Sequence, residues 1–263
     1  MEIKSSADFV RMTRAALAAS GFVRHELDGL VYWSSGGQAI LPVLVLIHGV
    51  NDQAGTWFPI APALARTHRV LIPDLAGHGE SAPKDGPLPL SMLLARLDAV
   101  IPDEPVTLVG NSMGGWLAML YTLAHPERVA RLVLEASGGL NLPFDSPTVA
   151  RSREEALVIL RNVHGPKFEA PEWVIDALLL RANDSPMLRL TEVAEHYVDS
   201  RLGEIRAPTT IVWGADDGVV PWAYIEALKN GIPHATLHVI EGAAHIPHMQ
   251  QSERFLACLT STS

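Results

Sequence analysis

The sequence predicts an α/β fold, in which a mostly parallel, twisted sheet is flanked by helices and carries a small helical cap. From about residue 43 to residue 136, apolar runs of strand length alternate with helical stretches, a pattern typical of βα units. The chain has 263 residues, and a hydrophobic content of 48% with only 19% charged residues argues against disorder. A chain of this length can bury a large core. We therefore expect a single domain over residues 1–263.

Two further elements are predicted ahead of this alternating core. Residues 6–20 place Phe9 and Leu17 on one side of a helix, and residues 22–33 form the pattern of a β-hairpin that turns around Gly29. We expect the helix to pack against the domain rather than to act as a lid.

The pattern changes between residues 137 and 206, a loop-rich stretch interrupted by several prolines. Helical periodicity returns there in three short segments. These segments cover residues 153–164, 172–181 and 187–200. We expect them to form a helical cap, inserted at about 137–206, over one edge of the sheet.

A glycine-rich turn at residues 110–114 carries the clearest indication of chemistry. Its sequence is G-N-S-M-G, and it joins the apolar run 106–109 to an apolar helical segment at 115–120. In a G-x-S-x-G turn the glycines stand where side chains would collide with the neighbouring strand and helix, and the serine is held strained and exposed. The order of strand, turn and helix predicts a nucleophile elbow at Ser112, although an ordinary glycine-rich βα turn has the same five residues.

Two later loops offer an acid and a base in the chain order that this architecture requires. Asp216 and Asp217 follow a predicted buried strand, and His245 follows a strand-like stretch at 236–240. Three βα loops at the same edge of the sheet therefore present a serine, an aspartate and a histidine. This coincidence favours a nucleophile at Ser112 over a plain turn.

These motifs resemble those of the α/β-hydrolase-fold enzymes, and the similarity covers nearly the whole chain. Residues 44–49 (L-V-L-I-H-G) resemble the strand and H-G oxyanion turn of that family, and residues 70–81 resemble its P-D-x-x-G-x-G-x-S segment. W-G-A-D-D at 213–217, with Pro221, resembles the W-G-x-x-D-x-x-x-P of the family. That register selects Asp217 as the acid.

Three side chains and two backbone groups then have defined roles. Ser112 attacks an acyl carbonyl, His245 accepts its proton and later returns one to the leaving group, and Asp217 orients the imidazole. Backbone N–H groups of Val50 and Met113 are expected to form the oxyanion hole. We expect neither a metal nor a cofactor.

Asp216 and His248 are the rival acid and base. His248 lies three residues after His245 but lacks the preceding Gly242-x-x context, and Asp216 suits a capping or turn role. The remaining histidines in or beside the motifs are expected to have structural or surface roles. They are His48, His78, His234 and His238.

Hydrolysis of a carboxylic ester through an acyl-enzyme is the first reaction expected. The serine excludes branches of the family with an aspartate nucleophile, such as epoxide hydrolases and haloalkane dehalogenases. The G-N-S-M-G-G form around Asn111 is similar to that of the meta-cleavage product hydrolases, which cut carbon–carbon bonds in vinylogous diketones, and to that of some bacterial lipases and esterases. A carbon–carbon hydrolase is therefore the alternative. A slow-turnover binding or receptor protein on the same fold is a third reading.

Two departures place the carbon–carbon reaction second. His245 is followed by Ile246, where the meta-cleavage enzymes commonly carry tryptophan. They also bind the substrate carboxylate with a cap arginine, and the matching register falls closer to Leu178 than to Arg181. A serine carboxylesterase is accordingly the leading prediction.

Composition restricts the partners and the location. A formal net charge of -9 without a basic patch argues against a nucleic-acid partner. No apolar run approaches the length of about 18 residues that spans a bilayer. Because Cys258 is the only cysteine and the first residues lack a signal-peptide pattern, a reduced, cytoplasmic setting is expected. The expected partner is a small ester substrate, and the sequence leaves the oligomeric state open.

Overall fold

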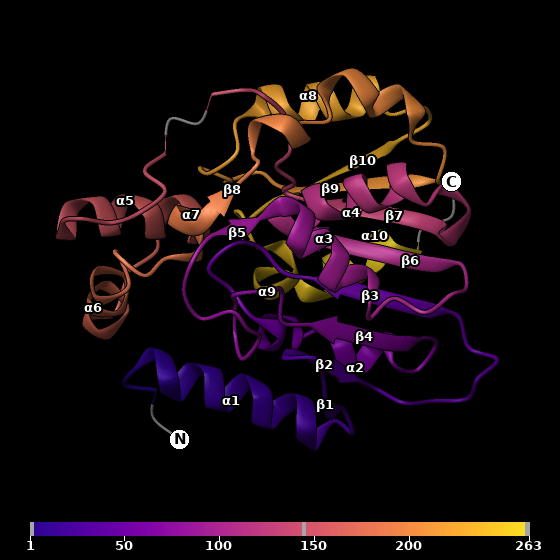
Figure 1. Ribbon diagram of the computed structural model, residues 1–263. Helices are drawn as coiled ribbons and strands as arrows, with labels where there is room; N and C mark the ends of the chain where they lie inside the picture. The colour runs from indigo at the N-terminus through magenta and orange to yellow at the C-terminus, as the bar shows by residue number, and fades with distance from the viewer. Residues whose placement is uncertain (1–2, 144–145, 261–263) are drawn as a thin grey trace.

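The computed structural model describes residues 3–143 and 146–260 and is built around one large β-sheet (Figure 1). The strands of this sheet are β1 (Val23–Leu27), β2 (Leu30–Ser34), β3 (Val43–Ile47), β4 (Arg69–Pro73), β6 (Val106–Asn111), β7 (Val129–Glu135), β9 (Thr209–Gly214) and β10 (Thr236–Ile240). Their order across the sheet is β1-β2-β4-β3-β6-β7-β9-β10. The β1-β2 and β2-β4 pairs are antiparallel and the others are parallel. The predicted fold class is confirmed.

Helices cover both faces of the sheet because the central strands are apolar on both faces. In β3, Val43, Val45 and Ile47 join one core cluster, whereas the alternating Leu44 and Leu46 join another. The first cluster contains residues of α3 (Leu90–Asp98), α4 (Met113–Ala124) and α8 (Trp222–Gly231). The second contains residues of α1 (Ser6–Ala19), the short helices η1 (Ala54–Trp57) and α2 (Ala61–Leu64), and α10 (Ser252–Thr260).

The N-terminal helix and hairpin form as the sequence predicts, and α1 is fixed to the body of the domain. Leu17 is fully buried in the second core cluster. Arg14 of α1 donates to the buried carboxylate of Asp74 at 3.1 Å. Asp74 also accepts from the backbone N–H groups of Ala54 (2.6 Å) and Glu80 (2.7 Å), so it organises the loop that follows β4.

The chain between β7 and β9 is made of short elements, of which α5, α6, α7 and β8 lie together at one end of the sheet (Figure 1), while Val198 and Leu202 join the first core cluster. It contains α5 (Arg153–His164), α6 (Glu172–Leu180), α7 (Pro186–Arg189), β8 (Leu190–Thr191), η3 (Ala194–His196) and η4 (Asp199–Glu204). Apolar residues of α5 and α6 make their own small core, which includes Ala156, Leu160 and Ile175. That this segment works as a cap stays a prediction.

The third helix predicted in this segment is wrong in its extent. The α-helix in the periodic stretch 187–200 ends at Arg189, because Leu190 then pairs as a strand with Leu88 of β5 (Leu88–Pro89), and only the short helices η3 and η4 follow. Glu192 follows with a φ of 61°, a left-handed conformation that a helix cannot contain. Pairing with a distant segment therefore overrides the local helical pattern.

Helix α4 starts very close to the strands beneath it. A Cβ atom at Gly114 would overlap the carbonyl oxygen of Ile47 in β3, and a Cβ atom at Gly110 would overlap the backbone of Gly114. Both positions therefore require glycine because backbone, which cannot turn away, occupies the space. This close approach fixes the turn between β6 and α4.

Gly114→Ala is expected to lower the midpoint of thermal unfolding, because the added methyl group must displace β3. Overpacking of this kind typically costs about 1–3 kcal/mol, and each kcal/mol shifts Tm by roughly 2–4 °C in a domain of this size. Gly203→Ala is the control, since a Cβ atom at Gly203 meets nothing within 4 Å. Thermal melts followed by circular dichroism check the difference, and equal Tm values for the two variants would contradict the close approach.

Candidate active site

Ser112 stands in a strained conformation between β6 and α4. Its φ of 53° and ψ of -118° lie outside the regions that a residue with a side chain ordinarily adopts. Its N–H donates to the carbonyl of Glu135 at 2.9 Å, and its own carbonyl accepts from Gly115 (3.0 Å) and Trp116 (3.2 Å). The turn has the geometry of a nucleophile elbow, with Ser112 partly exposed between the buried residues Asn111 and Met113.

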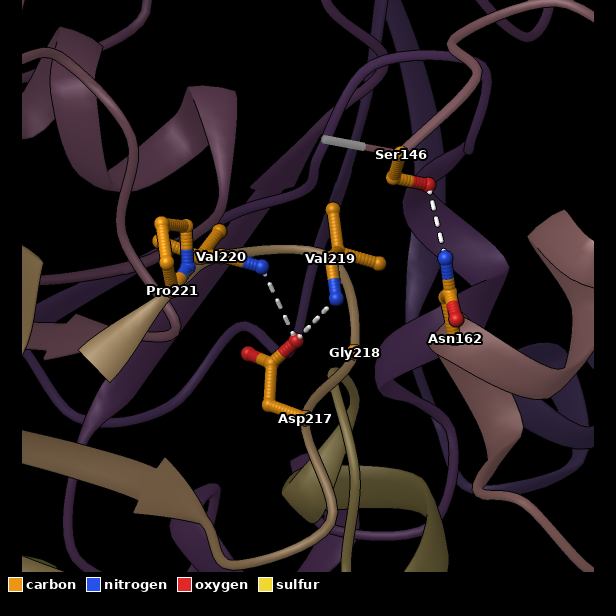
Figure 2. A pocket seen from close by; sticks show the side chains of 7 residues that line it. All are labelled: Ser146, Asn162, Asp217, Gly218, Val219, Val220 and Pro221. Carbon is orange, nitrogen blue, oxygen red and sulfur yellow. Dashed lines mark hydrogen bonds between the residues drawn. The ribbon is translucent and has the colours of Figure 1, made fainter. Parts of the chain in front are cut away.

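His245 and Asp217 form a hydrogen-bonded pair. The Nδ1 atom of His245 lies 3.0 Å from Oδ2 of Asp217, and both side chains are almost fully buried. The other carboxylate oxygen of Asp217 accepts from the N–H groups of Val219 (2.8 Å) and Val220 (3.2 Å), as Figure 2 shows. Because a proton on Nδ1 is held by Asp217, Nε2 is left unprotonated, the form that a general base needs.

The pKa of His245 is raised above its usual value. Burial is the largest single effect and lowers it, since a charged imidazole is disfavoured away from water. The charge and hydrogen bond of Asp217, with the charge of Glu135, outweigh burial. The site is therefore arranged to favour a positive charge on His245.

Contacts between neighbouring loops bring the histidine, the serine turn and the H-G turn together. The Nδ2 atom of Asn111 donates to the carbonyl of His245 at 2.9 Å, which ties the residue before Ser112 to the histidine loop. On the other side, a Cβ atom at Gly49 would lie 3.2 Å from Cβ of Ser112. The segment that holds Val50 therefore lies directly beside the serine.

The two residues whose N–H groups are predicted to bind the oxyanion, Val50 and Met113, directly follow Gly49 and Ser112 in the sequence. Met113 is the first residue of α4, and Val50 lies between Gly49 and Asn51, whose φ is 65°. The side chain of Asn51 accepts from the hydroxyl of Ser185 at 2.8 Å, so the loop is tied to the start of α7. Their role in binding an oxyanion stays a prediction.

The rival acid and base are placed elsewhere. Asp216 is exposed, and its N–H donates to the carbonyl of Ala243, whereas the neighbouring Asp217 reaches His245. His248 is fully buried and hydrogen-bonded to Glu135. The structure thus brings together Asp217 and His245, the pair that the motif register selected.

His48 and His78 lie side by side behind the H-G turn, with ring centroids 5.4 Å apart. Nδ1 of His48 donates to the Gly49 carbonyl at 2.7 Å, and its Nε2 accepts from the N–H of Leu75 at 3.0 Å. Burial lowers the pKa of His78 to about 3, with smaller effects in the same direction from His48 and from the guanidinium groups of Arg189 and Arg181. Both histidines support the turn.

Sequence reasoning missed Glu135, a fully buried carboxylate at the end of β7. Its only signal in the sequence is a charged residue that closes an otherwise apolar strand end, L-V-L-E. Its backbone carbonyl accepts from the N–H of Ser112, and its carboxylate bonds to His248, three residues after His245.

The last turn of α5 contacts the loops of both Asp217 and His245. The N–H of Gly218 donates to the carbonyl of Asn162 at 3.0 Å, and the N–H of His245 donates to the carbonyl of Val163 at 3.1 Å. A pocket lies between this turn and the acid loop (Figure 2). It is lined by Ser146, Asn162, Asp217, Gly218, Val219, Val220 and Pro221. Since Ser112 is not part of this lining, we do not assign the substrate to it.

Two properties of residues 3–143 and 146–260 bear on the kind of site. No helix there is long and apolar enough to cross a bilayer. No group of three or more His, Cys, Asp or Glu side chains is arranged to hold a metal ion in that part of the chain.

Comparison with known proteins identifies the family. Residues 44–257 match the model of the alpha/beta hydrolase family. The chain belongs to this family. A 2-hydroxy-6-oxononadienedioate/2-hydroxy-6-oxononatrienedioate hydrolase from Paraburkholderia xenovorans is 32% identical to it, over 90% of this chain and 93% of the relative.

Solved structures agree on the fold. A bacterial membrane phospholipase A, described as a virulence factor, superposes with a TM-score of 0.80 at 24% identity, over 96% of this chain and 91% of that one. The 2-hydroxy-6-oxo-6-phenylhexa-2,4-dienoate hydrolase from Rhodococcus sp. strain RHA1 gives 0.73 at 23% identity, over 90% and 96%. At such identities these two structures support the fold alone.

Ser112→Ala is expected to abolish covalent labelling by a serine-directed fluorophosphonate while the fold is kept, because only the nucleophilic oxygen is removed. Mass spectrometry of the labelled protein locates the adduct, and circular dichroism checks the fold. Persistent labelling at another serine would show that the elbow assignment is wrong.

Asp217→Asn and His245→Ala are each expected to slow this labelling by about 10³-fold or more, because the base loses its orientation or is absent. Asp216→Asn is the matched control, because Asp216 is exposed and it is Asp217 that bonds to His245, so this substitution should change the rate little. If Asp216→Asn were the more damaging of the two acid substitutions, the acid would have to be reassigned.

Proposed function

We propose that the chain is a serine hydrolase that works through an acyl-enzyme formed on Ser112. The observation that carries this proposal is the buried hydrogen bond between His245 and Asp217, joined through Asn111 to a serine in elbow geometry. These residue types in this chain order are those of the serine, histidine and acid triad.

In the first half-reaction, Oγ of Ser112 attacks a carbonyl carbon while Nε2 of His245 takes the hydroxyl proton. The carbonyl oxygen becomes an oxyanion, which the N–H groups of Val50 and Met113 would bind. The tetrahedral intermediate then expels the leaving group, which receives the proton from His245. Water, activated by the same histidine, hydrolyses the acyl-enzyme and regenerates Ser112.

For the substrate, we propose a vinylogous diketone of the meta-cleavage type, cleaved at a carbon–carbon bond. The support is the relative at 32% identity, which is named for hydrolysis of such a dienedioate. The sequence motifs favoured esters as the substrate, whereas this relative favours the alternative, carbon–carbon bond hydrolysis. In this reaction the leaving group is a carbon atom whose electron pair is delocalised into the unsaturated keto acid.

Positive charge near His78, whose ring lies against that of His48 in the H-G turn, also supports an anionic substrate. Arg181 and Arg189 lie close enough to His78 to add to the effect of burial on its pKa. The guanidinium of Arg189 donates to the backbone carbonyls of residues 83, 85 and 86, which are neutral acceptors and leave its charge in place. A dienedioate carries carboxylates that such a field attracts.

Ester hydrolysis is the second candidate, and the placement of the same arginines favours it. Arg181 is exposed at the C-terminal end of α6, and Arg189 is tied to the loop before β5. Neither guanidinium is a preformed clamp for a carboxylate. A neutral ester needs no such clamp and uses the same serine chemistry.

One panel ranks the two substrate classes. A meta-cleavage dienoate and p-nitrophenyl esters of short, medium and long acids are offered to one preparation, and kcat/KM is measured for each. We expect the highest value for the dienoate. A higher value for the best ester would make the chain an esterase, and no turnover of any of them would favour a binding protein on this fold.

Arg181→Gln separates the roles of charge and of the serine machinery. It is expected to raise KM for the dienoate about tenfold, because one charge-assisted contact worth about 1.4 kcal/mol is lost. The KM for a neutral ester should rise far less. Arg201→Gln is the control, because Arg201 pairs with Glu204 at the surface in η4. Equal effects of Arg181→Gln on both substrates would count against a carboxylate contact.

A further inference from the structure

A second buried pair of a carboxylate and an imidazole lies beside the candidate site. Glu135 and His248 are both fully buried. Oε1 of Glu135 accepts from the backbone N–H of His248 at 2.7 Å, and Oε2 lies 2.8 Å from its Nδ1. His248 belongs to the short helix α9 (Pro247–Gln250), which begins two residues after His245.

The surroundings of His248 exclude it as a second general base. Its Nε2 lies 3.1 Å from the hydroxyl of Thr56, and its ring lies against Trp57 with centroids 4.1 Å apart. Phe255 meets the ring edge-on at 6.2 Å. Both ring nitrogens are therefore engaged, and aromatic side chains cover the imidazole, so a substrate does not reach it.

Stability alone is a weak reason for such a pair. Removing a carboxylate from water costs several kcal/mol, and well-packed apolar residues of similar size are often as stable or more so. The location of Glu135 suggests another reason, because its backbone carbonyl bonds to the serine turn. Its carbonyl accepts from the N–H of Ser112 at 2.9 Å.

Glu135 thus holds both sides of the candidate site. Its carbonyl holds the backbone of Ser112, and its carboxylate holds the start of α9, the segment that directly follows His245. The side chain of Asn111, the residue before Ser112, also bonds to this segment through the carbonyl of His245. A shift of the carboxylate would move the histidine relative to the serine.

We propose that Glu135 is a positioning residue for the triad, which fixes His245 against Ser112 through His248. This inference rests on the proposed function, because it assumes that His245 is the general base.

The charged groups around His245 favour its protonated form. Asp217 faces it from the loop after β9, Glu135 from the end of β7, and His164 from the end of α5, while His248 lies beyond on α9. Burial, and to a smaller extent the charge of His245, lowers the pKa of His164 to about 4, so His164 is neutral near pH 7 and does not oppose the carboxylates. The charge of Glu135, like that of Asp217, raises the pKa of His245.

Glu135→Gln keeps the shape of the side chain and removes its charge. Because His245 reacts as a neutral base, the acid limb of the rate profile follows its pKa, and losing a carboxylate that raises this pKa moves the limb to lower pH. We expect that shift together with a rate lower by about 10- to 100-fold, a loss typical of groups that orient a reacting histidine from behind.

The rate of fluorophosphonate labelling of Ser112, measured from pH 5 to pH 9, is the readout because it does not depend on the natural substrate. Glu104→Gln is the matched control, since Glu104 pairs with Arg69 just before β6, at the opposite end of that strand from Ser112, and it should change neither the labelling rate nor the acid limb. Glu135→Asp keeps the charge but withdraws it from His248, so it should slow labelling without moving the limb.

The outcomes separate this inference from the proposed function. If Asp217→Asn leaves labelling unchanged, the triad itself is wrong. If Asp217→Asn slows labelling but Glu135→Gln leaves both the rate and the acid limb at their wild-type values, the role of Glu135 is refuted. Should Glu135→Gln fail to fold, a wild-type rate for Glu135→Asp would refute the positioning role.

Discussion

The left-handed backbone of Ser112 is the constraint on which the rest of the site depends. A residue with a side chain in such a conformation costs on the order of 1–3 kcal/mol and persists only where its surroundings leave no alternative. Here the surroundings are backbone: Gly110 and Gly114 bring β6, α4 and β3 so close that no Cβ atom fits between them. The strain is held by atoms that cannot rotate away, and the serine is therefore presented in one position.

Hydrogen bonds connect the neighbouring loops to this fixed serine turn and to one another. Asn111 and Glu135, at the ends of two adjacent strands, each bond to the turn or to the histidine loop. The last turn of α5 bonds to the loops of both Asp217 and His245. A movement of α5 relative to the sheet would therefore shift Asp217 and His245 together, which connects the segment between β7 and β9 to the geometry of the candidate site.

The parts of the fold that local sequence specifies were predictable. Apolar strands that alternate with helices, and a G-x-S-x-G turn between them, identified the sheet, Ser112 and the loops of Asp217 and His245. The helix at 187–200 was predicted too long because the pairing of Leu190 with Leu88 depends on a segment about a hundred residues away. Glu135 and its contact with His248 were missed for the same reason, since the two residues lie 113 residues apart in the sequence and only the tertiary fold brings them together.

The choice between ester and carbon–carbon hydrolysis depends on the leaving group rather than on the triad. Both reactions need the serine to add to a carbonyl, a step in which His245 becomes positively charged beside Asp217 and near Glu135. They differ in what receives the proton afterwards: an alkoxide oxygen in one case, and a carbon in a conjugated acid in the other. The groups that distinguish them must therefore lie where the leaving group rests. Arg181, just after α6, and Arg189, in α7, both act on the charge of His78 and are the charged residues that we propose to test for such a role. The triad motifs say little about this difference, because they specify only the groups that attack the carbonyl and transfer the proton, and these groups are the same in both reactions.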